Sequence, residues 1–408
     1  MISPAMTPNM SNVYFDNNST TALDERVLNA MLPFMTMQHG NATSRHVYGR
    51  TVRDAVEQAR EQVANAVGAY PSQVVFTASG TEANNFAISG IAGNLPNSQI
   101  VVSSIEHPCV TRPTFAMQKL GYKTKIVGVD SDGLLDLVHL ESILKNQVAS
   151  PTSLVSVMMV NNETGVIQNI SKIAEIAKRY KAYLHTDAVQ ALGKIPIDFA
   201  GLNFSAMTIS SHKIYGPQGA GALIVDKRID IAPLLHGGGQ EKGLRSGTEN
   251  VAAIVGFGAA CDLAISELTT RSCATKALRD HLEQGLVQMG AVMFGNKAAR
   301  IPNTSFFAFP NIEGETLVMA LDRKGFAVAS GSACSSDSTE PSHVLLAMGI
   351  SPDVARGAVR VSFGANQKHT NTLEQVDQFL VVLKQELQRL KQMTGVQFDT
   401  SATNIKAA

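Results

Sequence analysis

One lysine of the chain stands where it could bond covalently to a carbonyl compound. Lys213 lies within Thr208–Gly221 (TISSHKIYGPQGAG), after a β-rich run and before glycines that allow a tight turn. A lysine at a strand end among apolar residues is costly as a cation. Desolvation lowers its pKa and yields the neutral amine that attacks carbonyls. The stretch therefore predicts a Schiff-base lysine, and the alternative is a surface lysine beside a turn.

A second motif is suited to binding a phosphate group. Phe76–Asn84 (FTASGTEAN) follows an expected strand and opens an expected helix. Exposed amides and the positive dipole end at a helix N-terminus bind anions. Gly80 lets the backbone approach the anion, and Thr81 adds a hydroxyl group. The alternative is that Thr81 simply caps the helix.

Three further polar motifs also follow expected strands. His107, in SSIEHP, can stack on an aromatic ring or shuttle protons. An amide from Asn161–Gly165 (NNETG) can hydrogen-bond a phenolate oxygen without adding charge. Asp187 can pair with a protonated ring nitrogen, which keeps the ring an electron sink, and Gln190 can reach the same ring. The alternatives are that His107 is an ordinary loop histidine, that NNETG only forms a turn, and that Asp187 caps a helix.

Together these signals describe the binding site of one cofactor. A phosphate cup, a ring stacker, a phenolate donor, a carboxylate and a lysine each follow a strand of one expected sheet. Ligands of such sheets lie beyond the carboxyl ends of the strands. The order suits pyridoxal 5'-phosphate, so we predict that Lys213 holds this cofactor as a Schiff base.

Two residues near the C-terminal end of the chain point to the substrate. Cys334 lies in Ala329–Ser336 (ASGSACSS), a small-residue loop of the kind that a thiol needs if it must attack, carry cargo and swing. Arg360 stands inside an apolar strand, where its guanidinium suits a bidentate grip on an α-carboxylate. The alternatives are a bland loop cysteine and an arginine paired with a buried acid. The remaining cysteines are expected to be structural: Cys109, Cys261 and Cys273.

The elements that must position these residues indicate an α/β protein. Expected strands alternate with helices, which predicts a mostly parallel sheet of seven strands with helices on both faces. We expect a large cofactor-binding domain over 17–264, a smaller α+β domain over 1–16 and 265–394 that carries the cysteine loop, and a flexible tail over 395–408. The strands are expected at Gln73–Thr77, Gln99–Ser103, Lys123–Val127, Leu154–Val160, Ala182–Thr186, Ala206–Ser210 and Ala222–Val225.

Composition limits the partners and the location. The chain has 408 residues, 44% of them hydrophobic, and its 34 basic and 34 acidic residues leave no net charge. Balanced charge argues against nucleic acid or an anionic membrane as a partner, and no apolar run reaches the roughly 18 residues of a membrane span. The first residues have no basic start and no apolar run, so we do not expect them to act as a signal peptide. Four cysteines without a C-x-x-C pair or zinc spacing favour a cytoplasmic, reducing location and no metal site.

The motifs together resemble the cysteine desulfurase family of the NifS/IscS type. The resemblance runs from Tyr14–Thr21 (YFDNNSTT) to Val359–Gly364 (VRVSFG) and includes GNATSRHVYG, VNNETGVIQ, HGGGQEKGLRSGTEN and SGSACSSDSTEPSHVL. It implies a fold type I, class V aminotransferase-like enzyme that depends on pyridoxal 5'-phosphate and forms a homodimer. The departures are small: Ser79, Lys242 and Arg356 stand where glycine, arginine and histidine are common.

The resemblance also implies a role for individual residues. Lys213 would be the Schiff-base lysine and, once freed, the base that takes the α-proton. Cys334 would be the nucleophile that becomes a persulfide, and a transient ligand of an iron–sulfur cluster. His107 would stack on the ring and act in catalysis. The remaining implied contacts are Gly80, Thr81, Ser210, His212 and, from the other subunit, Thr248 for the phosphate; Asn162, Asp187 and Gln190 for the ring; and Asn41 and Arg360 for the substrate carboxylate.

The implied reaction removes sulfur from L-cysteine, gives L-alanine and leaves the sulfur on Cys334. A sulfur-acceptor or scaffold protein would then take it, for iron–sulfur cluster assembly or related sulfur trafficking. Two alternatives share the scaffold, a selenocysteine lyase and an aminotransferase, and the latter has no need of Cys334. A third is a non-catalytic scaffold for partner docking, which would stay colourless with added pyridoxal phosphate.

Overall fold

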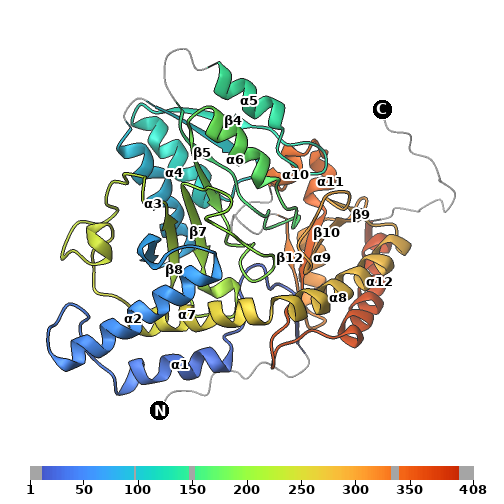
Figure 1. Cartoon of the computed structure of the whole chain (residues 1–408). Coiled ribbons are helices and arrows are strands. Elements are labelled where there is room, and N and C mark those ends of the chain that lie inside the picture. The colour runs from blue at the N-terminus through green and yellow to red at the C-terminus, as the bar shows by residue number, and fades with distance from the viewer. Residues whose placement is uncertain (1–11, 96–97, 147–151, 332–339, 395–408) are drawn as a thin grey trace.

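The computed structural model describes residues 12–95, 98–146, 152–331 and 340–394. At its centre lies a seven-stranded sheet with the strand order β2-β8-β7-β6-β5-β3-β4 (Figure 1). Neighbouring strands are parallel except at β8, which is antiparallel to both β2 and β7. The predicted mostly parallel sheet is therefore confirmed. Its strands are β2 (Val74–Thr77), β3 (Gln99–Ser103), β4 (Lys123–Val127), β5 (Thr152–Ser156), β6 (Tyr183–Asp187), β7 (Ala206–Ser210) and β8 (Gly221–Val225).

One strand ends earlier than the sequence predicts. The apolar run was expected to be a strand as far as Val160, but β5 ends at Ser156. The backbone beyond it still follows β6, because the amides of Val157 and Met159 donate to the carbonyls of His185 and Asp187. The chain then enters the loop Asn161–Gly165 (NNETG), beyond the carboxyl end of β5.

Helices cover both faces of the central sheet, as predicted. Side chains that alternate along a strand point to opposite faces. Ile100 and Val102 of β3 accordingly pack in one apolar core with α3 and α4, whereas Val101 packs in the other with α2, α5, α6 and α7. The helices of this part are α1 (Glu25–Thr36), α2 (Val47–Ala66), α3 (Gly80–Gly93), α4 (Pro108–Lys119), α5 (Leu137–Lys145), α6 (Ile170–Arg179) and α7 (Val251–Ser266), with 3-10 turns at Pro71–Gln73, Ser211–Lys213 and Glu241–Gly243.

A smaller α+β unit stands beside the large sheet and has its own core. Its four-stranded sheet has the order β12-β13-β10-β9, and the first short strand, β1, pairs in parallel with β11 (Figure 1). The rings of Phe15, Phe326, Phe363 and Phe379 meet in its core. The elements are β1 (Val13–Tyr14), α8 (Leu268–Gln288), β9 (Val292–Met293), β10 (Thr304–Ala308), α9 (Gly314–Asp322), β11 (Phe326–Ala327), β12 (Ala329–Ser330), α10 (His343–Ala347), α11 (Pro352–Arg356), β13 (Ala358–Ser362) and α12 (Leu373–Thr394).

The expected domain boundaries stay a prediction. The N-terminal strand does return to the smaller unit, through the pairing of β1 with β11. The expected tail, 395–408, lies outside the described residues, as does the segment 332–339 that contains Cys334. Within the residues described, no single helix combines the length and apolar character needed to cross a membrane. The bent pair α7 and α8, angled at 71°, meets that test only when the two helices are taken together.

Candidate active site

One cavity of about 370 Å³ lies beyond the carboxyl ends of the central strands. The loops that follow β2, β3, β5, β6 and β7 form its walls, and the smaller unit closes it with Ser330, Gly331 and a residue of β13. The structure thus brings together most of the side chains that the sequence singled out. The predicted residues on its wall are Gly80, Thr81, His107, Asn162, Asp187, Gln190, Ser210, His212, Lys213 and Arg360.

Lys213 ends a 3-10 turn that directly follows β7. Its Nζ atom donates to the carbonyl oxygens of Asn18 and Ser19, each at 2.6 Å. These carbonyls belong to the N-terminal segment, which crosses over the cavity after β1. Gly216 is needed behind the lysine, because a Cβ there would lie 2.0 Å from the Oγ atom of Ser211. The local fold therefore fixes the amine at the cavity wall.

The phosphate motif forms the N-terminus of α3. Ser79 is the capping residue, since its Oγ atom accepts from the amide of Glu82 at 3.1 Å. The alternative that Thr81 caps the helix is therefore wrong, and Thr81 is an exposed residue of the first turn that lines the cavity. Gly221 allows β8 to pass close by, because a Cβ there would lie 2.7 Å from the backbone of Ser79. The result is a helix N-terminus open to the cavity.

A buried hydroxyl without a partner lies next to this helix N-terminus. The Oγ atom of Ser210 is buried and has no hydrogen-bond partner in the protein. It lies near Gly80, where an added Cβ would come within 3.8 Å of it. Nearby, burial lowers the pKa of His212 to about 4, and Thr20 is in contact with its Nδ1 atom at 3.1 Å. A phosphate oxygen would satisfy the orphaned hydroxyl, so this end of the cavity fits a phosphate group.

His107 is the capping residue of α4. Its Nδ1 atom accepts from the amide of Cys109 at 3.2 Å, so a neutral ring carries its proton on Nε2. Burial lowers the pKa of this histidine, which favours the neutral ring. Position and protonation together make it a flat, uncharged ring on the cavity wall, suited to stack on an aromatic ligand.

Asp187 ends β6 with both oxygens in hydrogen bonds. Its Oδ1 atom accepts from the amide of Val189 at 2.9 Å, and its Oδ2 atom accepts from the Nδ2 atom of Asn84 at 2.8 Å. These bonds hold the carboxylate plane in place while the group lines the cavity. A fixed carboxylate here suits a cationic ring nitrogen.

Arg360 is buried in β13, and its guanidinium has both bonded and unbonded nitrogen atoms. Its guanidinium donates to Asp16 at 2.7 Å, to Ser19 at 2.9 Å and to the carbonyl of Asn162 at 2.9 Å. Arg360 thus pairs with an acid, as in the alternative, but Asp16 is only partly buried, with its side chain 19% exposed. The Nε atom of Arg360 nevertheless has no partner and is buried, and the side chain lines the cavity. An anionic ligand can accept a hydrogen bond from this Nε atom.

The structure does not bring two of the expected residues to this cavity. Thr248 and Asn41 are both exposed and lie outside its wall. The Oδ1 atom of Asn41 accepts instead from the backbone and hydroxyl of Thr43. Cys334 lies outside the described residues, although Ser330 and Gly331, just before it in the chain, line the cavity.

Sequence reasoning missed several residues of the wall. Asn84 appeared only as part of a motif, and Asn18 only as part of the resemblance. Cys109 was expected to be structural, but it lines the cavity, with its Sγ atom 3.0 Å from the Nδ2 atom of Asn84. Cys273 is exposed, so the expectation of structural cysteines is met only by the buried Cys261. The position of Cys109, two residues after His107 at a helix start, was the available signal.

Comparison with known proteins places the chain in a family. The model of the class-V aminotransferases matches residues 13–379. A cysteine desulfurase IscS of Dictyoglomus turgidum is 40% identical over 93% of this chain and 95% of its own length. Among solved structures, a NifS-like protein matches with a TM-score of 0.85 and 38% identity, over 93% of this chain and all of its own. A structure described as SspA in complex with cysteine matches with a TM-score of 0.75 and 31% identity, over 86% and 98%.

The chain belongs to the class-V aminotransferase family of enzymes. Its fold is that of the NifS-like, fold type I members. Within the family it belongs with the cysteine desulfurases of the NifS/IscS type, as the resemblance of its motifs implied.

Proposed function

We propose that this chain transfers the sulfur of L-cysteine to the thiol of Cys334, with pyridoxal 5'-phosphate bound in the cavity through Lys213. One observation carries the proposal: side chains from five strand ends and from β13 converge on one cavity and offer a set of groups complementary to that cofactor. Relatives named cysteine desulfurases support the reaction, and the cysteine complex of a structural neighbour supports the substrate.

The residues present fit the proposed cofactor. The N-terminus of α3 with Gly80 and the partnerless hydroxyl of Ser210 would hold the phosphate, together with Thr81 and His212. His107 would lie against the ring, and Asp187 would face its nitrogen. Bound pyridoxal phosphate supplies a carbonyl carbon for the lysine and an electron sink for the substrate.

Lys213 would move the α-proton of the substrate. The carbonyls of Asn18 and Ser19 are acceptors only, and both already receive hydrogens of Nζ. They therefore stabilise the amine in its protonated form, after it has taken the proton. The N-terminal segment thus contributes to proton transfer although it lies almost 200 residues earlier in the chain.

Arg360 would orient the substrate carboxylate through its Nε atom, which has no partner in the protein. Asp16 and the Asn162 carbonyl hold the rest of the guanidinium, so its plane is already fixed before substrate arrives. The expected role of Asn41 stays a prediction, because this residue lies outside the cavity wall.

The sulfur step balances without an external oxidant or reductant. The Cys334 thiolate attacks the substrate sulfur, an S–S bond forms, and the bond from that sulfur to the substrate Cβ breaks. The carbon fragment takes the electron pair and a proton and leaves as alanine. The outer sulfur atom of the persulfide then passes to a sulfur-acceptor or scaffold protein, and Cys334 is left as a thiol. The acceptor would serve iron–sulfur cluster assembly or related sulfur trafficking. A homodimer in which Thr248 reaches the partner's phosphate and a cytoplasmic location belong to the same proposal.

The test measures alanine formed from cysteine by the holoenzyme and by a Cys334→Ala variant. The proposal expects loss of nearly all alanine in the variant, while the absorption of bound pyridoxal phosphate is retained. Lys213→Ala serves as the matched control, and it is expected to lose both the activity and the borohydride-trapped cofactor. Full alanine production by Cys334→Ala would contradict the sulfur step and favour another reaction on this scaffold.

A further inference from the structure

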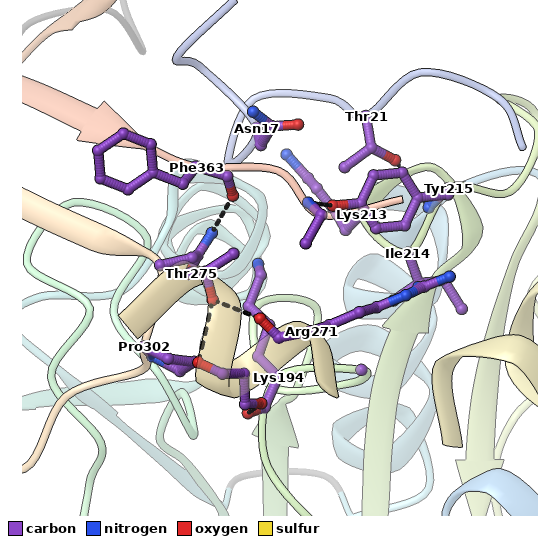
Figure 2. Close-up of a pocket in the computed structure, with 14 residues that line it drawn as sticks. Asn17, Thr21, Lys194, Lys213, Ile214, Tyr215, Arg271, Thr275, Pro302 and Phe363 are labelled. Carbon is purple, nitrogen blue, oxygen red and sulfur yellow. Dashed lines mark hydrogen bonds between the residues drawn. The ribbon is translucent and has the colours of Figure 1, made fainter. Parts of the chain in front are cut away.

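A second, smaller cavity of about 30 Å³ lies behind Lys213, and another lysine lines it. Figure 2 shows Lys194 and Lys213 among the residues that line it, together with Arg271 and Thr275 of α8. Lys194 follows Gly193, which has a φ of +72° and a position where a Cβ would lie 2.9 Å from Ile214. The side chain of Lys194 is half-buried, and its amine reaches Gln190 on the wall of the cofactor cavity.

The amine of Lys194 meets a residue of the cofactor cavity. Its Nζ atom donates to the Oε1 atom of Gln190 at 2.5 Å. The Nε2 atom of the same Gln190 donates to the carbonyl of Asn18 at 2.8 Å. That carbonyl also accepts from the Nζ atom of Lys213. A chain of hydrogen bonds therefore runs from Lys194 through Gln190 and Asn18 to Lys213.

Both ends of the Gln190 amide have partners that allow only one orientation. A backbone carbonyl only accepts, so the nitrogen must face Asn18. The oxygen must then face a donor, and Lys194 supplies one whether its amine is charged or neutral. Gln190 is 5% exposed, and both ends of its amide have partners within the protein. A primary amide nitrogen has two hydrogens, and the bond to Asn18 uses one of them.

We propose that Lys194 is a positioning residue that fixes the Gln190 amide with its nitrogen, rather than its oxygen, toward the ring of the bound cofactor. The inference rests on the proposed cofactor, whose phenolate oxygen is an acceptor. The second hydrogen of Nε2 then becomes a donor to that oxygen. Without Lys194, Oε1 of Gln190 is a buried acceptor without a partner, which favours other side-chain conformations.

The charges around Lys194 explain why it is suited to this task. The pKa of its amine lies well below the ordinary value, because the amine is desolvated and because Lys213 and Arg360 are cationic neighbours. Arg271 lines the same small cavity, but Glu267 neutralises it at 2.7 Å. A lysine that is easily neutral can hold Gln190 without adding a further full charge beside Lys213.

The experiment follows the absorption spectrum of the holoenzyme as a function of pH. Loss of a donor to an anionic ring oxygen makes the bound chromophore hold its proton more tightly. Lys194→Met is therefore expected to raise the midpoint of the spectral change by about one pH unit, a tenfold shift, as expected for one hydrogen bond to a charged acceptor. Lys194→Arg, which keeps a donor, is expected to return the midpoint to that of the wild type.

A double-mutant cycle separates positioning from a direct charge effect. In a Gln190→Ala background, Lys194→Met is expected to shift the midpoint by less than about 0.3 units, because the residue through which it acts is gone. An unchanged midpoint in Lys194→Met, or an equal shift in both backgrounds, would overturn the inference. A wild-type protein that takes up no pyridoxal phosphate would overturn the proposed function itself and, with it, this role of Lys194. The two failures are distinguished by the wild-type spectrum.

Discussion

The Sγ atom of Cys109 lies 2.9 Å from the Nδ1 atom of His107, inside the cavity that is proposed to bind the cofactor. The cavity thus contains a thiol, Cys109, in addition to the proposed nucleophile Cys334, which lies outside the described residues. Burial raises the pKa of the Cys109 thiol, and the nearby carboxylate of Asp187 raises it further. The thiolate is the nucleophilic form of a cysteine, and a raised pKa makes it scarce at neutral pH. Cys109 therefore lines the cavity but is expected to be a poor nucleophile.

Alkylation of the native holoenzyme is expected to distinguish the cysteines. Cys273 is exposed on α8, whereas Cys109 is half-buried with a raised pKa and Cys261 is buried. We predict that iodoacetamide at neutral pH labels Cys273 at least about tenfold faster than Cys109, because the thiolate fraction falls tenfold per pKa unit. Peptide mass spectrometry measures the rates. Equal labelling of the two residues would show that Cys109 is an active thiol.

Asn84 is predicted to support Asp187. Asn84→Ala removes the donor at 2.8 Å from Oδ2 while leaving the carboxylate in place. Its rate of alanine formation should fall by roughly tenfold, the effect expected for one lost orienting hydrogen bond of about 1.4 kcal/mol. Asp187→Asn removes the charge itself and should cost at least tenfold more than Asn84→Ala.

The comparison uses kcat measured at saturating pyridoxal phosphate, so that weaker cofactor binding does not obscure it. Asn85→Ala is a matched control one residue along α3, because its amide bonds only to the carbonyl of Thr81. Asn84→Ala with the wild-type rate would remove this asparagine from the account of the site.

Glu106 is predicted to make stability depend on pH. The carboxyl is fully buried, with one oxygen bonded to Ser103 and Met158 and the other without a partner. Desolvation raises its pKa from 4.5 to about 8. A raised carboxyl pKa means that the folded state binds the proton more tightly. Its contribution to stability is therefore complete below about pH 4.5 and is lost as the pH rises through about 8.

Glu106→Gln keeps the shape of the side chain but cannot ionise. The variant is expected to lose less stability than the wild type between pH 5 and pH 9, so their thermal midpoints should approach or cross at the alkaline end. Scanning calorimetry at several pH values measures the difference. Parallel curves for the two proteins would show that Glu106 does not titrate in this range.

A buried ion pair is predicted to hold the loop that carries Thr248. Arg60 of α2 donates to both oxygens of Glu241 at 2.8 Å, and Glu241 also accepts from the amide of Phe76 in β2. Glu241 and the next residue, Lys242, have φ values of +45° and +61°, so the loop is held in an uncommon conformation.

Arg60→Met leaves a buried carboxylate unpaired and should destabilise the protein by about 3–5 kcal/mol. Arg228→Met is the control, because Arg228 forms an exposed pair with Asp226. Similar urea midpoints for the two variants would contradict the prediction.

Much of the site follows from the sequence because it depends on strand ends. Asp187 ends β6 and Lys213 ends the turn after β7, and the carboxyl ends of such neighbouring parallel strands meet at one edge of a sheet. Periodicity and motif order therefore predicted both the sheet and most of the cavity wall. The bond between Lys213 and Asn18 joins residues 195 positions apart, and no local pattern predicts it. Cys109 was misjudged because a helix start says nothing about which side chain turns inward.

The positions of Asn41 and Thr248 have a different cause. Their roles came only from the resemblance of the motifs, and in a single chain both are exposed and lie away from the cavity. For Thr248 this position agrees with the proposal that it serves the partner's site, which one chain alone cannot display. The proposed phosphate contact of Thr248 would therefore require a homodimer.

The central claim is that sulfur leaves cysteine and becomes bonded to Cys334. Mass spectrometry of the holoenzyme after treatment with L-cysteine, followed by alkylation and peptide mapping, tests it directly. The account predicts one added sulfur atom on the peptide that contains Cys334, and none on the peptides of Cys109, Cys261 or Cys273. The same treatment of Lys213→Ala should leave Cys334 unmodified. An unmodified Cys334 in a wild-type protein that forms alanine from cysteine would contradict the account.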